Sequence, residues 1–230
     1  DIEVAAESGF PDVFNVAEEL LLITVQDYNT KFIMTFGSRP YKTNPNRKNH
    51  RYVDCHSEEG LITTFVDWWQ RNTPEVITGW NCELYDIPYL MGRMERIMGE
   101  KYAKRMSPWG IVRRNEIKIS GRDNIAYDLA GISVIDYLDL YKKSPATPNQ
   151  ESFRLDHIAL MELGQQKLDH SEYDTFREFY TKNWQKFVDY NIVDVELVDR
   201  LEDKLKLIDL CCTRAYDAKI NFTDVAFQVR

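Results

Sequence analysis

The sequence predicts an α/β protein with a mixed central β-sheet flanked by helices. Two observations support this class. Apolar, β-branched runs such as residues 20–27 and 31–37 predict strands, and between such runs lie segments whose apolar residues recur at helical spacing. A chain in which strands precede and interleave with helices packs those helices against a sheet. Its 230 residues, 43% hydrophobic and 13% aromatic, are enough for a sizeable core.

In the first half of the chain, turn residues divide the apolar runs into short predicted strands. These lie at residues 1–4, 20–27, 31–37, 52–55 and 75–80. Tyr28-Asn29-Thr30 predicts a hairpin turn, and the polar segment 38–51 predicts a loop. Two helices are expected here, one capped by Ser57 and one over residues 87–98 with Pro88 in its first turn.

The second half begins with a predicted long hairpin, an insertion at about residues 111–129 with Gly121-Arg122 between its arms. A strand is predicted next, at 132–140, before the loop Pro145-Ala-Thr-Pro148. Helical spacing then predicts three helices, near 152–163, near 173–180 and, as a long terminal helix, over 184–214.

The net charge of −8 argues at first against a nucleic-acid partner, but the charge is unevenly distributed. Between Met91 and Arg122 there are nine basic and three acidic residues, a local balance of +6. Between Glu151 and Leu210 there are 14 acidic and 8 basic residues. A basic flank beside an acidic remainder is compatible with binding a phosphate backbone. A solvated charged surface is the alternative, and charge alone favours it.

The four cysteines, at positions 55, 82, 211 and 212, have no Cys-x-x-Cys spacing, and two are adjacent. This pattern suits neither a zinc site nor a disulfide framework, so we expect reduced thiols in an intracellular protein. No stretch approaches the ~18 uncharged apolar residues of a membrane span. The chain opens with Asp-Ile-Glu-Val and has no basic-then-apolar leader. We therefore expect a cytoplasmic protein without a membrane partner.

Three short acidic patterns are candidates for chemistry. Asp1 and Glu3 are two residues apart, so on a strand both carboxylates project from one face. Asp86 follows an apolar strand and a Gly-Trp-Asn turn at the start of a predicted helix. Tyr190 and Asp194 stand at i and i+4 of a predicted helix and share a face.

Each pattern also has a plain structural explanation. Asp1 and Glu3 could be exposed acids on an edge strand. Asp86 could simply cap its helix, a role compatible with metal binding. Tyr190 and Asp194 could be an aromatic–acid pair on the surface.

Taken together, the patterns resemble a known family. Asp-Ile-Glu, Asn-Cys-Glu-Leu-Tyr-Asp and Tyr-Asn-Ile-Val-Asp are similar, in order and spacing, to the three exonuclease motifs of family B DNA polymerases. The likeness is closest to the replicative polymerases of T-even-like bacteriophages, and Thr78–Asn81 and Gly131–Lys143 resemble connecting segments of the family. The resemblance implies a ribonuclease H-like exonuclease fold with a protruding β-hairpin. It extends from Asp1 to Arg230.

The resemblance also implies roles for individual residues. Asp1, Glu3, Asp86 and Asp194 correspond to metal ligands, and Tyr190 to the residue that orients the attacking water. Residues implied to contact DNA are Asn81, Tyr85, where the family often has Phe, the hairpin residues Arg113, Arg114 and Arg122, and Lys167. Lys167 is a candidate for a family lysine near the scissile phosphate, although Gln165 and Gln166 intervene after Gly164.

The implied activity is proofreading, the removal of mismatched 3′-terminal nucleotides by two-metal-ion phosphodiester hydrolysis. Two metals ~3.5–4 Å apart can activate water and stabilise the leaving oxygen. Carboxylate ligands without His or Cys favour Mg²⁺ or Mn²⁺ over zinc. The implied partners are the single-stranded 3′ end of a DNA primer, the remainder of the polymerase chain and replisome proteins such as a sliding clamp. If the protein is phage-encoded, its location is the host cytoplasm.

We expect residues 1–230 to be the exonuclease domain, truncated at its first motif. Polymerase motifs such as Asp-x-x-Ser-Leu-Tyr are not among these residues, so palm, fingers and thumb are not expected here. Two alternatives stay open. One is a stand-alone 3′→5′ exoribonuclease relative, and the other is a non-catalytic nucleic-acid-binding module of the polymerase in this truncated form.

Overall fold

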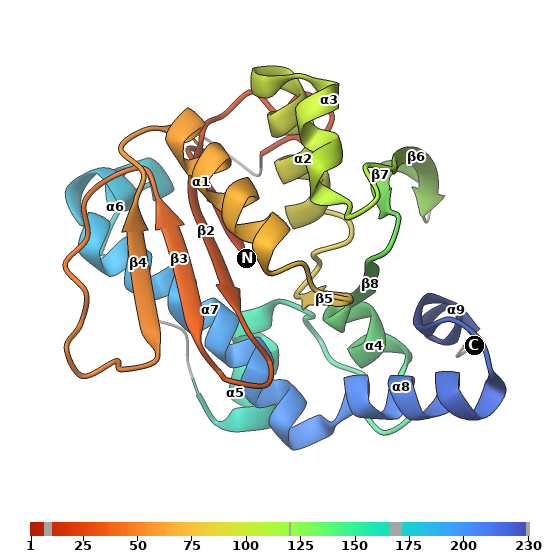
Figure 1. Cartoon of the computed structure of the whole chain (residues 1–230). Coiled ribbons are helices and arrows are strands. Elements are labelled where there is room, and N and C mark those ends of the chain that lie inside the picture. Colours follow the sequence, from red (N-terminus) through yellow and green to blue (C-terminus); the bar gives the residue numbers. More distant parts are fainter. Residues whose placement is uncertain (7–10, 120, 166–171, 229–230) are drawn as a thin grey trace.

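The computed structural model describes residues 1–6, 11–119, 121–165 and 172–228 (Figure 1). The strands are β1 (Ile2–Val4), β2 (Leu20–Gln26), β3 (Ile33–Gly37), β4 (His50–Asp54), β5 (Val76–Gly79), β6 (Val112–Ile119), β7 (Arg122–Leu129) and β8 (Ser133–Asp136). The helices are α1 (Glu58–Arg71), α2 (Asp86–Met98), α3 (Glu100–Ala103), a 3₁₀ turn (Lys104–Met106), α4 (Tyr137–Lys143), α5 (Leu155–Leu163), α6 (Phe176–Lys182), α7 (Trp184–Leu205), α8 (Leu207–Ala218) and α9 (Phe222–Gln228).

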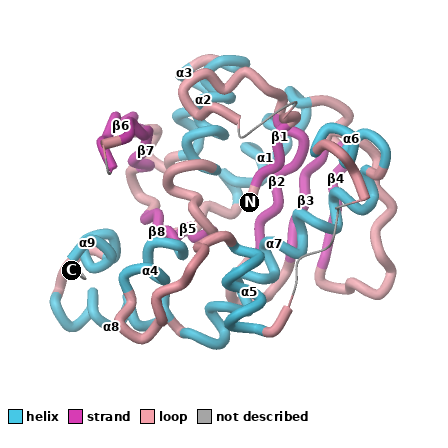
Figure 2. The backbone as a smooth tube through the Cα atoms, turned by 180° about the vertical axis from the view of Figure 1, so that it is seen from behind, coloured by secondary structure: helices cyan, strands magenta, loops and turns pink. Residues whose placement is uncertain are grey.

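A four-stranded mixed sheet organises the N-terminal half. Its order is β1-β2-β3-β4, with β2 antiparallel to both β1 and β3, and β4 parallel to β3. Helix α1 lies over one face, where Phe65 packs edge-to-face on Phe36 of β3. Helix α7 crosses the other face, as Figure 2 shows from behind. The mixed α/β class predicted from the sequence is therefore confirmed.

The sheet is buried on both faces because each face carries its own apolar cluster. Leu61, Phe65 and Trp69 of α1 belong to one cluster, together with residues of α2. Leu22 and Ile33 contribute to the other, together with Phe187 of α7. Strand β1 forms the edge of this sheet beside α7, so its backbone leads directly to the region where α7 crosses.

Two smaller strand pairs lie beside the main sheet. β5 and β8 are parallel, and their last residues, Gly79 and Asp136, pair with each other. β6 and β7 pair antiparallel in a continuous register from Val112↔Leu129 to Ile119↔Arg122, at the margin of the molecule next to α2 (Figure 1).

Several predicted boundaries differ from the structure. The strand predicted at 132–140 is wrong after Asp136: its carboxylate accepts hydrogen bonds from the N–H groups of Leu138 and Asp139, and this cap starts α4. The long terminal helix predicted over 184–214 is also wrong. The first helix, α7, ends before Lys206, whose φ of +55° lies in the left-handed region. The buried carboxylate of Glu202 accepts from the N–H groups of Ile208 and Asp209, which caps a new helix, α8.

The remaining boundaries move by a few residues. β4 begins at His50, two residues earlier than predicted, and α5 and α6 begin at Leu155 and Phe176, later than predicted. The Ser57 cap of α1 is confirmed, because its side chain accepts from the N–H of Gly60 at 3.1 Å. Within the described part of the chain, none of the helices combines the length and apolar character needed to cross a bilayer.

Candidate metal centre

Strand β1 brings the first two carboxylates together. Because side chains alternate along a strand, Asp1 and Glu3 project from the same face on either side of Ile2. Asp1 is exposed, whereas Glu3 is 9% exposed. The explanation of both as exposed edge-strand acids is therefore wrong for Glu3.

Helix α7 supplies the third carboxylate. One ligand oxygen from each of Asp1, Glu3 and Asp194 lies within 4.8 Å of the others. Asp194 is 7% exposed, so its explanation as part of an exposed surface pair is also wrong. Asp194 thus meets Asp1, 193 positions earlier in the chain, because α7 crosses the sheet at its β1 edge.

Asn191 holds two members of this group, Asp1 and Glu3, although the sequence patterns did not single it out. Its Nδ2 donates to Asp1 Oδ2 at 2.6 Å and to Glu3 Oε1 at 3.4 Å, and its side chain is fully buried. A polar residue three positions before Asp194, on the same buried face of a helix, is a signal that could have identified it.

Asp86 approaches the group from helix α2. Its Oδ1 accepts from the backbone N–H of Ile2 at 3.0 Å, so it lies against the strand segment between Asp1 and Glu3. Asp86 is the first residue of α2, and the N-cap position before it is occupied by Tyr85, which makes no side-chain capping bond. Its carboxyl is 7% exposed, and burial raises its pKa. Asp86 is not part of the group formed by Asp1, Glu3 and Asp194, whose ligand oxygens lie within 4.8 Å of one another.

The two predicted tyrosines lie close in the chain to two of these carboxylates, Asp194 and Asp86. Tyr190 stands one turn before Asp194 on α7, and its ring packs edge-to-face on Phe179. Tyr85 immediately precedes α2 and packs near Tyr89. Burial, and after it the charges of Asp86 and Glu3, raise the pKa of Tyr85.

Asn81 stands in the turn after β5, with a φ of +64° in the left-handed region. Its backbone N–H donates to Asp136 Oδ1 at 3.1 Å. Asn tolerates this conformation better than most residues because its short polar side chain can bond locally. The turn therefore has a defined shape that carries Asn81, Tyr85 and Asp86 in succession.

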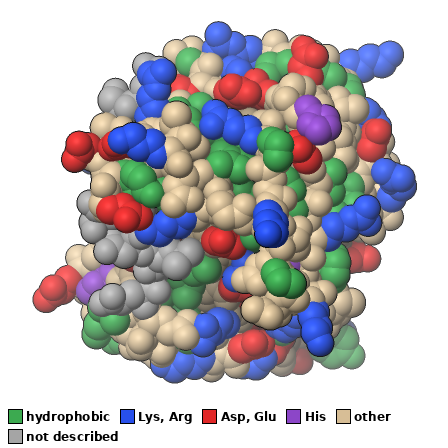
Figure 3. Space-filling model, turned by 90° about the vertical axis from the view of Figure 1, so that its left-hand side faces the viewer, with side chains coloured by type: hydrophobic (Ala, Val, Ile, Leu, Met, Phe, Trp, Pro, Cys, Tyr) green, Lys and Arg blue, Asp and Glu red, His purple; other side chains and the backbone are tan. Residues whose placement is uncertain are grey.

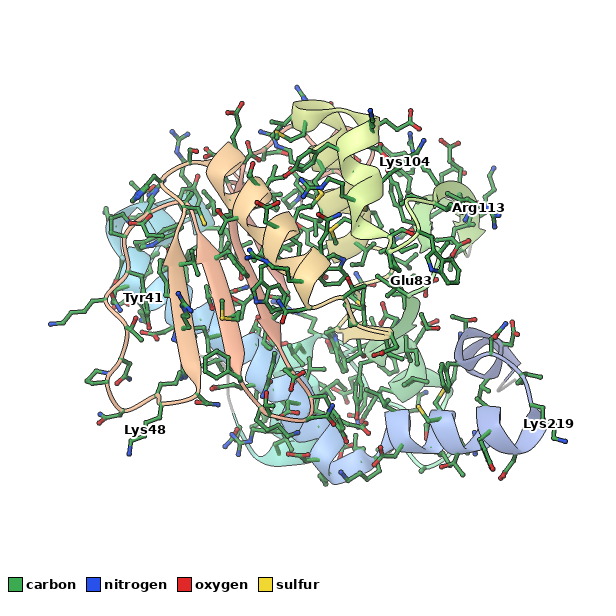
Figure 4. All side chains as sticks on the ribbon, viewed as in Figure 1. Tyr41, Lys48, Glu83, Lys104, Arg113 and Lys219 are labelled. Carbon is green, nitrogen blue, oxygen red and sulfur yellow. The ribbon has the colours of Figure 1, made fainter. Side chains whose placement is uncertain are left out.

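The predicted basic residues of the hairpin lie on β6 and β7. Arg113, labelled in Figure 4, pairs with Asp128 at 3.4 Å, and Arg114 pairs with Glu116 at 3.4 Å. Arg122 is exposed at the start of β7. The positive charge of this strand pair is thus partly neutralised by its own acids. Lys167 lies outside the described residues.

On the face toward β4 and α6, basic and acidic side chains are interspersed (Figure 3). The net negative charge is therefore not gathered into one patch on that face.

The candidate centre differs from this surface, because its acids converge at short range and are mostly buried. Such carboxylates repel one another, and a bound cation relieves the repulsion. A donor set of carboxylate oxygens matches hard divalent cations.

Comparisons with known proteins agree on one family. Residues 1–158 match the model described as "DNA polymerase family B, exonuclease domain". The chain is 39% identical over 175 residues to the DNA-directed DNA polymerase of Escherichia phage RB69, an alignment that covers 76% of this chain and 19% of that protein. It is 34% identical over 179 residues to the DNA-directed DNA polymerase of Enterobacteria phage T4, covering 78% of this chain and 20% of that one. A DNA polymerase of Autographa californica nuclear polyhedrosis virus is 26% identical over 187 residues. The chain spans about a fifth of the length of these curated relatives.

Proposed function

Because this chain belongs to the exonuclease domain family of family B DNA polymerases, we propose that Asp1, Glu3, Asp86 and Asp194 hold two divalent cations, Mg²⁺ or Mn²⁺, for hydrolysis of DNA. The domain is a 3′→5′ exonuclease with a proofreading function. Members of the family use divalent metals.

The convergence of Asp1, Glu3 and Asp194 within 4.8 Å is the observation that carries the proposal. Asp194 lies beyond the matched residues 1–158, so geometry supports its inclusion independently of that match. Asp86 joins through its bond to Ile2. The donor chemistry also fits: all four groups are carboxylates, and the four charges balance two divalent cations.

When bound, the two cations supply charge for activating water and for stabilising the leaving 3′ oxygen. The protein residues hold and orient the reactants. Asn191 keeps the Asp1 and Glu3 carboxylates in place through its amide N–H groups. Tyr190 offers a hydroxyl that can hydrogen-bond the attacking water, because it stands on α7 one turn before Asp194. The mostly buried acids make the centre less accessible to bulk solvent.

The substrate we propose is the single-stranded 3′ end of a DNA primer. Asn81 and Tyr85 are proposed to contact its terminal nucleotides, since they stand in the turn that leads to Asp86, and the face of an aromatic ring can stack on a base. Arg113, Arg114 and Arg122 on the β6–β7 hairpin, together with Lys167, are proposed to meet phosphates. The hairpin corresponds in this proposal to the family's strand-separating hairpin.

We also propose the larger context of the domain. Residues 1–230 form a ribonuclease H-like exonuclease domain of a longer polymerase chain, with the hairpin at about 111–129 as an insertion. Its partners are the remainder of that chain and replisome proteins such as a sliding clamp. The site of action is the cytoplasm of the host cell.

A digestion assay tests the proposal. The full chain is incubated with Mg²⁺ or Mn²⁺ and 5′-end-labelled single-stranded DNA or RNA. We expect metal-dependent shortening of DNA from its 3′ end, with the rate falling by at least 10²-fold in Asp86→Ala, because one ligand of a two-metal site is lost. Absence of shortening, or an Asp86→Ala rate equal to wild type, contradicts the proposal. Faster cleavage of RNA than of DNA favours an exoribonuclease.

A further inference from the structure

We propose that Asp136 is a positioning residue for the candidate metal centre, because its carboxylate fixes the turn that carries Asn81, Tyr85 and Asp86. This inference rests on the proposed function, since it assigns Asp136 to the same site. Asp136 is far from Asp86 in sequence and was predicted to lie inside a strand. Its role follows from four backbone hydrogen bonds.

Both oxygens of Asp136 are engaged, and the side chain is 6% exposed. Oδ1 accepts from the N–H groups of Asn81 at 3.1 Å, Leu138 at 2.9 Å and Asp139 at 3.4 Å. Oδ2 accepts from the N–H of Glu83 at 3.0 Å. One buried carboxylate therefore joins the start of α4 to the turn after β5.

Helix capping alone does not account for this arrangement. A cap needs one side-chain oxygen directed at the second and third N–H groups of the helix, and Oδ1 fulfils that need for α4. The bonds to Asn81 and Glu83 go beyond it and reach a different segment of the chain. They leave the two turn N–H groups satisfied inside the protein, where an unbonded N–H is costly.

The strand register places Asp136 at this turn. β5 and β8 are parallel and paired, so Gly79 and Asp136 stand side by side where both strands end. The turn then folds closely back on β5, because a Cβ added to Gly79 would lie 2.9 Å from the Cβ of Cys82. Figure 4 labels Glu83 at this junction of β5 and α2.

A short path of bonds leads from the turn to the carboxylates. The carbonyl of Asn81 accepts from the N–H of Tyr85, and the carbonyl of Cys82 accepts from the N–H of Ile87. These two bonds lead the chain into α2. Asp86 lies between Tyr85 and Ile87 and reaches the N–H of Ile2. The geometry of the turn thus sets where Asp86 lies relative to Asp1 and Glu3.

Asp136→Asn is the informative variant. If its amide oxygen takes the place of Oδ1, the cap of α4 and the bond to Asn81 remain. The amide nitrogen then faces the N–H of Glu83 and cannot accept its hydrogen bond. Asp139→Asn is the matched control, since it removes the same charge from the same helix at a half-exposed residue that pairs with Lys143.

Two measurements on the full chain test the proposal. In the metal-free protein, we expect amide hydrogen exchange of Glu83 to be faster in Asp136→Asn than in wild type, with Leu138 unchanged. In a Mn²⁺ titration of the excision rate on single-stranded DNA, we expect the half-saturating Mn²⁺ concentration to rise about tenfold, which corresponds to ~1.4 kcal/mol. Asp139→Asn should behave as wild type in both.

The outcomes separate this inference from the proposed function. If wild type does not shorten DNA, the proposed function fails, while amide exchange still decides whether Asp136 holds the turn. If Asp136→Asn lowers the free energy of unfolding but leaves the half-saturating Mn²⁺ concentration unchanged, Asp136 acts only as a structural cap. This result overturns the positioning role. An equal rise in half-saturating Mn²⁺ for Asp139→Asn overturns it as well, because charge rather than hydrogen bonding is then the cause.

Discussion

Asn191 and Asp86 illustrate how buried polar contacts define the acidic group. Asn191 donates to two carboxylates from α7, and Asp86 accepts from the backbone between them. Each contact joins segments that are distant in the chain. Hydrogen bonds to charged groups are roughly twice as strong as neutral ones, so we expect these contacts to govern metal affinity.

Asn191→Ala is predicted to weaken Mn²⁺ binding. The variant removes the donor that holds Asp1 and Glu3 together, at a cost of about 1.5–3 kcal/mol, or roughly tenfold or more in affinity. Calorimetric Mn²⁺ titration measures the change. Glu196→Gln, on the same helix and paired with Arg47, is the control and should retain wild-type affinity. Unchanged affinity in Asn191→Ala contradicts the role assigned to its amide.

Glu83 provides a prediction for pH. Burial, and after it the charges of Asp136 and Asp139, raise the pKa of Glu83 from 4.5 to about 7. A carboxyl whose folded-state pKa is raised contributes stability below its unfolded pKa and loses it as pH rises through the folded one. In Glu83→Gln this loss is absent. Relative to wild type, the variant should therefore gain stability between pH 4.5 and 7, by on the order of 1 kcal/mol after allowing for solvent screening.

Denaturant unfolding of both proteins at pH 4.5 and pH 8 measures this difference. Asp203→Asn serves as the comparison, since its side chain is 52% exposed and its charge is not among those that raise the pKa of Glu83. A stability difference between wild type and Glu83→Gln that is the same at both pH values contradicts the assigned ionisation.

At the residue scale, sequence patterns identified the carboxylates but not the groups that hold them. Asp1 and Glu3 follow strand alternation, and Asp194 follows helical spacing, so their neighbourhood could be predicted once a common site was assumed. Asn191 and Asp136 could not be assigned because their partners depend on tertiary contacts. An Asn in a helix and an Asp at a strand end each have several common roles.

At the scale of elements, the break between α7 and α8 depends on one side chain. Glu202 is 1% exposed and accepts from the N–H groups of Ile208 and Asp209 at 3.0 and 3.2 Å. These groups are at the start of α8 and have no partner within their own helix. The carboxylate also carries negative charge to the positive end of the helix dipole.

Glu202→Ala is predicted to lower the free energy of unfolding by about 2 kcal/mol, because the N–H groups of Ile208 and Asp209 at the start of α8 lose their capping acceptor. Glu202→Gln should lose less, since its amide oxygen still accepts. Urea unfolding monitored by circular dichroism measures both. The neighbouring Asp203→Ala, whose side chain is 52% exposed, should change stability by no more than ~1 kcal/mol. Equal effects at 202 and 203 run against the capping role.

The elements that periodicity predicts well are those with long, strong patterns, such as α1 and the strands β2 and β3. The errors lie where a side chain ends one element and starts another. Helical spacing continues through Lys206, and apolar spacing continues through Asp136, so neither break is visible without the capping contacts of Glu202 and Asp136. The spacing of apolar residues indicates which face of an element is apolar, whereas the ends of helices and strands depend on hydrogen bonds.

At the scale of the whole molecule, the candidate centre joins three parts of the fold. Asp1 and Glu3 come from the edge strand β1, Asp86 from α2 and Asp194 from α7. A cation bound by all of them cross-links the sheet to helices on different sides. Binding is therefore expected to stabilise the entire domain and not one segment.

Metal removal provides the corresponding prediction. A ligand that binds only the folded state adds ~2.7 kcal/mol at a concentration 100 times its dissociation constant. The melting temperature should accordingly be higher in Mn²⁺ than in EDTA, as calorimetry measures. The double variant Asp86→Ala/Asp194→Ala should show a smaller difference or none. A difference of the same size in the double variant places the stabilising ion elsewhere.

Anomalous scattering from crystals of the full chain soaked with Mn²⁺ and a short single-stranded DNA would locate the cations themselves. We predict two Mn²⁺ peaks about 3.5–4 Å apart, bound by carboxylate oxygens of Asp1, Glu3, Asp86 and Asp194, with the 3′-terminal phosphate beside them. Mn²⁺ peaks bound only at other residues, with these four carboxylates free of metal, contradict this prediction.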